Sequence, residues 1–321
     1  MKQFTRAAAA LAVLLLGAGS AAAEFPERPV SIIVPWAAGG GTDTVVRIFA
    51  AGFEKELGVP VNVVNRPGGN GIAGHNAIAS ATPDGYTLGA ASPEIAFYKT
   101  LGTSEITPDS VDLFSRLAVI PAGVTVREDS PFKTIDDLIK AAKENPKGTF
   151  SGSGTGTGGS WHIAMGGLLK AAGLPADQAR WVPSQGGTPA LQDVVSGGIT
   201  MFTGSPIEAK SLLEANRVRT IVMMTSERQD AFPNVPTTKE ANIDWVYENW
   251  FALVAPKGIP AEARKKLYDA AKRAHALPEV QDMLKQRGIK PVWDEPGTFE
   301  KYVAEFVSKG TAVLKDLGLA K

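Results

Sequence analysis

Short runs of β-branched and other apolar residues alternate along the chain with longer stretches whose apolar residues recur every three or four positions. In the first third, Val46, Phe49 and Phe53 fall on one side of a predicted helix, which Gly58 ends. Strand, helix and strand follow at short spacing, an order that predicts a parallel sheet with right-handed crossovers. The predicted strands of this part are 30–34, 61–65 and 86–91, and its helices are 42–57 and 72–80.

The middle of the chain repeats this alternation, and the last third is predicted to be helical. One middle helix begins at Thr134, with Asp137 at the spacing of a capping box. Predicted strands start at 148–151 and follow at 181–182, 199–202 and 218–225, and the helices of this part are 134–144, 160–172, 188–196 and 207–215. The predicted C-terminal helices are 261–276, 279–287 and 298–317.

Two stretches, near 117–126 and 250–256, are predicted to cross between two halves of the molecule. A chain that leaves one domain, builds a second and returns has this layout. We therefore expect an α/β protein of two domains, each a mostly parallel sheet flanked by helices. The expected first domain is 24–124 plus 251–321, and the inserted second domain is 125–250.

Residues 1–23 have the pattern of a cleaved secretory signal. Lys2 and Arg6 form a positive start, 7–17 is apolar, and small residues end the segment. The apolar run is shorter than the roughly 20 residues that span a bilayer, and no cysteine follows it for lipid attachment. We expect a soluble, periplasmic mature chain that begins near Glu24 and has no membrane anchor. An uncleaved N-terminal anchor helix is the alternative.

Composition narrows the possible chemistry. Lys+Arg is 33 and Asp+Glu is 33, so no basic excess indicates nucleic-acid binding. The absence of cysteine excludes thiol catalysis, disulfides, iron–sulfur clusters and Cys-type zinc sites. His75, His162 and His275 are far apart in sequence, so no local metal or triad motif is formed. Export weighs against an enzyme that needs ATP or NAD. We expect no metal and no cofactor.

Two glycine-rich loops, 35–44 and 151–160, each lie between a predicted strand and a predicted helix. Glycine allows close approach of the backbone to a ligand, and a helix start has unpaired N–H groups and a partial positive charge. A strand, a glycine loop and a helix in this order form an anion site. One loop in each half predicts a ligand with an anionic group at each end. Hydroxyls that could add donors are Thr42, Ser153, Thr155, Thr157 and Ser160.

Other interpretations of these loops stay open. Glycine between strand and helix can serve tight packing alone. Asp43 would repel a bound anion, so we expect it to accept N–H groups of its own loop. Glu94 raises the same charge problem and is left out of the candidate site. Trp36 is a candidate for the pocket wall or for the core.

Rival motifs fit poorly. Residues 154–159 match G-x-G-x-x-G, but Asp177, the acid at the right distance, precedes the predicted strand 181–182 that a dinucleotide site requires it to follow. The sequence contains no phosphate-binding P-loop and no G-x-S-x-G nucleophile motif. Ser160 and His162 are two apart on a predicted helix and do not face each other. We expect His162 to pack or to form a hydrogen bond.

Seven segments together resemble the substrate-binding proteins of tripartite tricarboxylate transporters, the Bug-type receptors, and most resemble their tricarboxylate-receptor branch. The resemblance covers essentially the whole mature chain, with the motifs in the family's order. The segments are RPVSIIVPWAAGGGTD (28–43), VVNRPGG (63–69), PDGYTL (83–88), GGSWH (158–162), VPSQGGTPA (182–190), FPNVPT (232–237) and VAP (254–256).

The resemblance implies a two-domain periplasmic binding protein of type II-like fold, which closes on a small carboxylate held by backbone N–H groups, hydroxyls and waters. The chain departs from the family at 197–200, where Gly-Gly-Ile-Thr stands without the acid found in many members. The ligand-binding residues implied by the motifs are Ala38, Gly39, Gly40, Gly41, Thr42, Asp43, Ser92, Ser153, Thr155, Gly159, Ser160, Ser184, Gln185 and Ser205.

These observations predict a non-enzymatic, monomeric receptor. It would capture a di- or tricarboxylate such as citrate and present it to membrane permease subunits. One alternative is a secreted hydrolase that uses Ser160 or another serine with a histidine brought near by folding. Another is a receptor for an amino acid or an aromatic acid.

Overall fold

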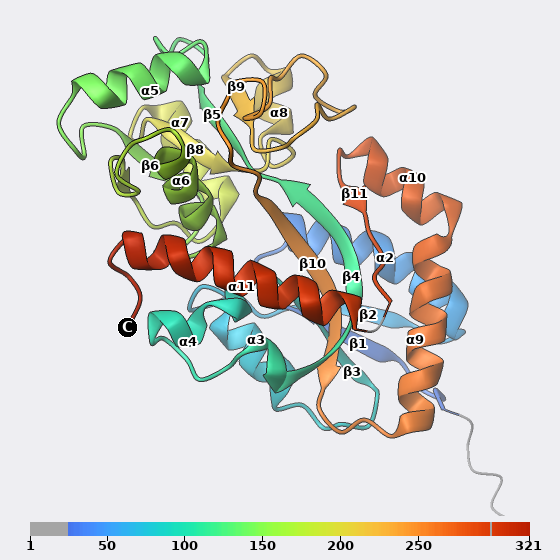
Figure 1. The fold of residues 1–321 in the computed structure, drawn as a ribbon. Helices are drawn as coiled ribbons and strands as arrows, with labels where there is room; N and C mark the ends of the chain where they lie inside the picture. The colour runs from blue at the N-terminus through green and yellow to red at the C-terminus, as the bar shows by residue number, and fades with distance from the viewer. Residues whose placement is uncertain (1–24, 296) are drawn as a thin grey trace, which may run out of the picture.

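The computed structural model describes residues 25–295 and 297–321, which fold into two lobes, each around one sheet (Figure 1). The predicted signal segment 1–23 and the expected mature start at Glu24 lie outside the described residues. Within the described ranges, none of the helices combines the length and the apolar character needed to cross a membrane.

The first lobe surrounds a six-stranded sheet. Its strands are β1 (Val30–Val34), β2 (Val61–Asn65), β3 (Thr87–Ala91), β4 (Val111–Pro121), β10 (Glu248–Pro256) and β11 (Lys290–Pro291). Its helices are α2 (Gly41–Leu57), α3 (Ile72–Ala79), α4 (Tyr98–Leu101), α9 (Ala261–Ala276), α10 (Pro278–Gln286) and α11 (Thr298–Asp316), with 3-10 turns η1 (Pro93–Ala96) and η2 (Pro108–Ser110). The strand order is β11-β4-β10-β3-β1-β2.

The second lobe surrounds a five-stranded sheet in the order β7-β6-β8-β5-β9. Its strands are β5 (Gly123–Arg127), β6 (Ser151–Ser153), β7 (Arg180–Trp181), β8 (Met201–Gly204) and β9 (Val218–Met223). Its helices are α5 (Ile135–Glu144), α6 (Ser160–Ala171), α7 (Gly187–Ser196) and α8 (Lys210–Glu214).

Local sequence signals account for several element boundaries. Val46, Phe49 and Phe53 of α2 are buried against the first sheet, and Gly58 ends the helix with φ of 73°. In α5, the Thr134 hydroxyl accepts the Asp137 N–H at 3.2 Å, and the Asp137 carboxylate accepts the Thr134 N–H at 2.9 Å. This is the predicted capping box. The bounds of α9 coincide with the prediction.

Most strands of each sheet run in one direction, as predicted, although both sheets also contain antiparallel pairs. β1 pairs in parallel with β2 and β3, and β6 in parallel with β7 and β8. β10 runs antiparallel to β3 and β4, and β5 runs antiparallel to β8 and β9. β5 and β10, the strands that follow the two crossings, enter their sheets from the opposite end, so their direction opposes that of the strands formed by strand–helix–strand units. The α/β, two-sheet architecture is as predicted.

The chain passes between the two sheets twice (Figure 1). The first passage lies within the predicted stretch 117–126, whereas the second lies before 250–256, which belongs to β10 of the first sheet. Ala122 alone separates β4 of the first sheet from β5 of the second. The chain leaves the second sheet after β9 and returns to the first at β10. The C-terminal helix α11 also contacts the second lobe, because Lys170 of α6 forms an ion pair with Asp316.

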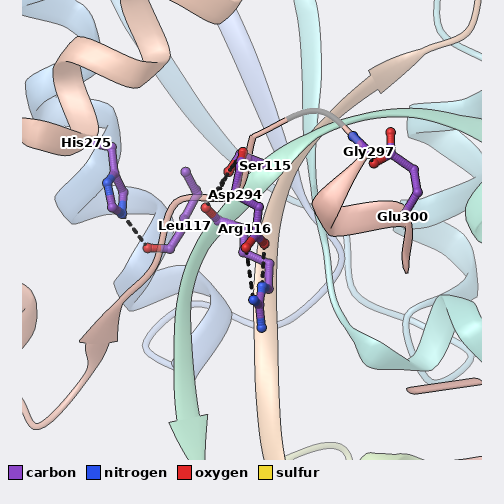
Figure 2. Close-up of polar contacts among 7 residues, drawn as sticks. All are labelled: Ser115, Arg116, Leu117, His275, Asp294, Gly297 and Glu300. Atoms are coloured by element: carbon purple, nitrogen blue, oxygen red, sulfur yellow. Dashed lines mark hydrogen bonds and ion pairs between the residues drawn. The ribbon is translucent and has the colours of Figure 1, made fainter. Parts of the chain in front are cut away.

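Figure 2 shows how the C-terminal part of the chain is tied to β4. Arg116 forms a bidentate ion pair with Asp294, with nitrogen–oxygen distances of 2.5 and 3.0 Å. The His275 ring, through Nε2, is hydrogen-bonded to the Leu117 carbonyl at 2.7 Å. These contacts hold α9 and the segment before α11 on the first sheet, and they give His275 a structural role.

Candidate functional site

A cavity of about 280 Å³ lies between the two lobes. It is bounded where strands of both sheets end and helices begin, the usual ligand position in α/β sheets. Residues of the first lobe that line it are Trp36, Ala37, Ala38, Gly40, Gly41, Thr42, Ser92, Glu94, Asn249 and Phe251. Residues of the second lobe that line it are Thr155, Trp161, Gln185, Gly186, Gly187, Thr188, Pro189 and Glu208.

The first wall is the glycine loop at the start of α2. Gly40 is the N-cap residue, and Gly41 and Thr42 form the first turn. Asp43 points back into the loop and accepts the Gly39 N–H at 2.8 Å. Burial raises the pKa of Asp43, but hydrogen bonds from Arg47, Gly39 and other donors outweigh burial and hold it below its ordinary value. Asp43 therefore braces the loop from behind and leaves the first N–H groups of α2 directed to the cavity.

The facing wall includes the start of α7, with Thr155 and Trp161 from the loop and first turn of α6 beside it. Gly186 adopts φ of 136°, a conformation that glycine allows, and Gly187 opens the helix. Ser184 fixes this loop, because its N–H donates to the Thr155 carbonyl at 3.0 Å and its hydroxyl donates to the Gly186 carbonyl at 2.9 Å. Two helix N-termini, one from each lobe, thus meet across the cavity.

The N-terminus of α6, where the second anion site was predicted, is occupied by a carboxylate of the protein itself. The Ser160 N–H and hydroxyl donate to Glu94 Oε1 at 3.2 and 2.7 Å. Ser92 donates to Glu94 Oε2 at 2.8 Å and accepts from Trp36 Nε1 at 3.0 Å. Asn249 donates to the Ser160 hydroxyl at 2.9 Å. The expected anion-binding geometry is present, but Glu94 of the first lobe fills it.

Glu208 is the second acid of the cavity, and its surroundings differ from those of Glu94. Its Oε2 atom is buried and has no hydrogen-bond partner among the described residues. Burial, with a smaller effect of the Glu94 charge, raises the pKa of Glu208 from 4.5 to about 8. A Cβ atom on Gly187 would lie 2.2 Å from Oε2, so only glycine leaves room for this carboxylate beside α7.

The predicted ligand-binding residues divide into two groups. Half of them line the cavity: Ala38, Gly40, Gly41, Thr42, Ser92, Thr155 and Gln185. The other half lie outside the lining, where several support it through hydrogen bonds: Gly39, Asp43, Ser153, Gly159, Ser160, Ser184 and Ser205.

Sequence reasoning missed the chemistry of two cavity residues. Glu94 was set aside because of its charge, and Glu208 was not considered. Both follow the carboxyl end of a strand, β3 and β8 respectively, and such positions in an α/β sheet point to the ligand side. That placement was the signal available in the sequence. Gly186 and Gly187 were quoted only as part of a family motif, although they form the facing helix start.

The hydrolase alternative has no support in the geometry. Ser160 donates to Glu94, while His162 Nδ1 accepts the Gly158 N–H at 3.0 Å. The His162 ring stacks on Trp181 with 4.5 Å between centroids, and burial lowers its pKa to about 4. His162 has the expected packing and hydrogen-bonding role. Among the described residues, no cluster of three or more His, Asp or Glu side chains could hold a metal ion.

Two lobes joined by crossing strands, with a cavity between helix N-termini, define a solute-binding protein of the periplasmic binding class. The chain belongs to the tripartite tricarboxylate transporter receptor family, since the profile of that family matches residues 45–319. It is therefore a receptor and not an enzyme, and the predicted family and fold are confirmed.

Several relatives place the chain within this family. A UPF0065 protein of Cupriavidus necator is 34% identical over 319 residues, which covers 98% of this chain and 95% of the relative. MatC of Rhodopseudomonas palustris, solved with bound malate, is 27% identical with a TM-score of 0.79, covering 90% and 100% of the two chains. A second R. palustris structure, with adipate, is 25% identical with a TM-score of 0.83, covering 92% and 99%.

Proposed function

We propose that the protein is exported to the periplasm, captures a small organic carboxylate between its lobes and delivers it to the membrane permease subunits of a tripartite tricarboxylate transporter. The observation that carries this proposal is the meeting of two glycine-initiated helix N-termini, α2 and α7, across one cavity. The first N–H groups of a helix lack partners within it and carry partial positive charge. The malate and adipate in the two related structures support a carboxylate as the ligand class.

A ligand carboxylate fits best at the start of α2. Gly41 and Thr42 present N–H groups of the first turn, and the Thr42 hydroxyl is a further donor. Each charge-assisted hydrogen bond contributes about 1.5–3 kcal/mol. Closure of the lobes excludes water and strengthens these bonds. This site needs no arginine, and the cavity lining contains none.

The charges in the cavity limit how many carboxylate groups the ligand can carry. Glu94 and Glu208 share the cavity with the ligand, and no Lys, Arg or His is among the lining residues. Two like charges 4 Å apart repel by about 4 kcal/mol at an effective dielectric constant of 20. A dicarboxylate can therefore bind if Glu208 keeps its proton and donates it, which a pKa of about 8 allows at neutral pH. A tricarboxylate would bring a third charge without a cation to meet it.

Calorimetry with citrate, malate, succinate and adipate tests the proposal, with thermal unfolding as a second readout. A ligand that binds only the folded state raises the free energy of unfolding, by about 2.7 kcal/mol when its free concentration is 100 times Kd. The melting temperature rises as a result. At least one carboxylate should release heat and raise the melting temperature. If neither readout responds to any small carboxylate, amino-carboxylates included, the receptor proposal is wrong.

The export and hinge predictions belong to the same proposal. N-terminal sequencing of the protein from a periplasmic extract should begin at or near Glu24. The segments 24–124 with 251–321 should move as one unit against 125–250, about the crossings at Ala122 and between β9 and β10. Small-angle scattering should then give a smaller radius of gyration with ligand than without it. An unchanged radius would contradict closure.

A further inference from the structure

Two cavity residues have a buried oxygen without a partner among the described residues, Asn249 through Oδ1 and Glu208 through Oε2, and only that of Glu208 belongs to an acid. Oε2 is enclosed and accepts no hydrogen bond from the described residues. Buried polar atoms are nearly always satisfied, and an exception in a ligand cavity indicates a missing donor. Glu208 lines the cavity between the α2 and α7 loops, so a ligand in the cavity contacts this side chain, and a turn of the carboxyl group away from Gly187 brings Oε2 to the ligand.

The charges in the cavity indicate the kind of donor. Glu94 is already satisfied by Ser92 and Ser160, whereas Glu208 has no such donors. The lining includes these two acids and no basic side chain. A carboxylate buried beside another acid is stabilised by a positive group that carries N–H donors. A quaternary ammonium has no N–H and would leave Oε2 unsatisfied, so a protonated amine fits better.

We propose that the cavity takes an amino-carboxylate, whose carboxylate binds at the N-terminus of α2 and whose protonated primary or secondary amine donates to Glu208. The inference rests on the receptor function proposed above and names the second functional group of its ligand. Trp36, Trp161 and Phe251 form an apolar wall of the same cavity, where aromatic faces add attraction for a cation. Glu208 is then the residue that selects an amine over a second carboxylate.

The pH dependence has opposite signs for the two ligand types. In the free protein, burial and the facing Glu94 charge hold the pKa of Glu208 at about 8. An amine needs the ionised form, so its affinity should rise about tenfold for each pH unit from 6 towards 8. A dicarboxylate needs the protonated form, so its affinity should be flat below pH 8 and fall above it.

The test uses matched ligand pairs that differ only at one end. These are 4-aminobutanoate against succinate and 6-aminohexanoate against adipate, each titrated by calorimetry at pH 6, 7 and 8. We expect the amino member of at least one pair to bind ten times or more tightly than its partner, with the rising pH profile. If a dicarboxylate binds as tightly as its amino partner or more tightly, the inference is overturned while the receptor function stands.

Variants separate the role of Glu208 from a general charge effect. Glu208→Gln keeps the shape of the side chain and should weaken the amino-carboxylate at least tenfold, remove the pH dependence, and leave the dicarboxylate unchanged or tighter. Glu214→Gln, an exposed acid at the end of α8, should change neither. Equal weakening of both ligand types by Glu208→Gln would overturn the inference.

Mass spectrometry of the compound released from denatured protein provides an independent readout. A co-purified compound with a carboxyl group and a basic nitrogen supports the inference, and one without a basic nitrogen overturns it. If no ligand pair binds and nothing co-purifies, the receptor proposal fails and the inference fails with it.

Discussion

The glycine loops before α2 and α6 have the same sequence pattern but different surroundings in the structure. Each follows a strand, each is rich in glycine, and each opens a helix. The α2 loop faces the cavity, and its own acid, Asp43, lies behind it. The start of α6 is closed by Glu94, which arrives from the other lobe. An anion-binding helix start is therefore a ligand site only where the protein does not supply the anion itself.

The two cavity acids extend this comparison. Glu94 is held by hydroxyl and N–H donors, whereas Glu208 Oε2 has none among the described residues. Removal of the Glu208 charge should therefore stabilise the free protein, whereas removal of the Glu94 charge should destabilise it. Four measurements test the difference between these positions.

The largest effect is expected from Glu208→Gln in the free protein at high pH. An acid with a raised pKa binds its proton more tightly when folded, so wild-type stability falls as pH rises from 4.5 to about 8. The upper limit of this loss is on the order of 5 kcal/mol. The variant should be more stable than wild type above pH 8 and similar to it near pH 4.5. Urea unfolding across this range measures the difference, and a pH-independent difference would contradict the assignment.

Glu94→Ala should have the opposite sign and the next largest effect. It leaves the Ser160 N–H and the Ser92 and Ser160 hydroxyls without their acceptor. We expect a loss of about 3 kcal/mol in urea unfolding at pH 7, since hydrogen bonds to a charged group contribute about 1.5–3 kcal/mol each. Glu214→Ala, an exposed control, should stay within about 0.5 kcal/mol. A loss in Glu94→Ala no larger than the control would show that Glu94 does not hold α6.

Gly41→Ala should weaken ligand binding and leave folding nearly unchanged. A Cβ atom at this position would lie 3.1 Å from Ile120 Cδ1 and 3.5 Å from Glu208 Oε1, inside the cavity. We expect at least a tenfold loss of affinity, about 1.4 kcal/mol, for the tightest carboxylate found by calorimetry. Gly198→Ala is a matched control, because the nearest atoms to a Cβ at this position would be 3.5 and 3.6 Å away and Gly198 lies outside the cavity lining. Equal affinities for the two variants would place the ligand elsewhere.

Trp36→Phe should produce the smallest effect. It removes the indole N–H that donates to Ser92 and keeps the aromatic wall. We expect about 1 kcal/mol less stability and a smaller change in affinity, since one neutral hydrogen bond is lost. Urea unfolding and calorimetry on the same sample measure both. A loss as large as that of Glu94→Ala would mean that Trp36 has a larger structural role than one hydrogen bond.

Much of the fold was predictable because local signals determine it. Helical spacing gave α9 with its bounds, the Thr134 capping box marked the start of α5, and Gly58 marked the end of α2. The antiparallel entry of β10 was not predicted, because its pairing with β3 and β4 joins residues more than 100 positions apart. No local pattern records which end of a sheet such a strand enters.

The site was predicted in part for a similar reason. The α2 loop could be identified because its glycines, hydroxyl and helix start are contiguous. The carboxylate that binds at the N-terminus of α6 could not be identified from sequence, because Glu94 and Ser160 are 66 positions apart and belong to different lobes. Glu208 depends on Gly187 for its space, a relation that only tertiary structure reveals.

The contact between Glu94 and Ser160 has a kinetic consequence. It joins η1 of the first lobe to α6 of the second, and Asn249 of β10 adds another bond to the same hydroxyl. The proposed opening of the lobes at this point has to break these bonds, and each bond to the Glu94 carboxylate contributes about 1.5–3 kcal/mol. The junction should therefore favour the closed form and lengthen its lifetime.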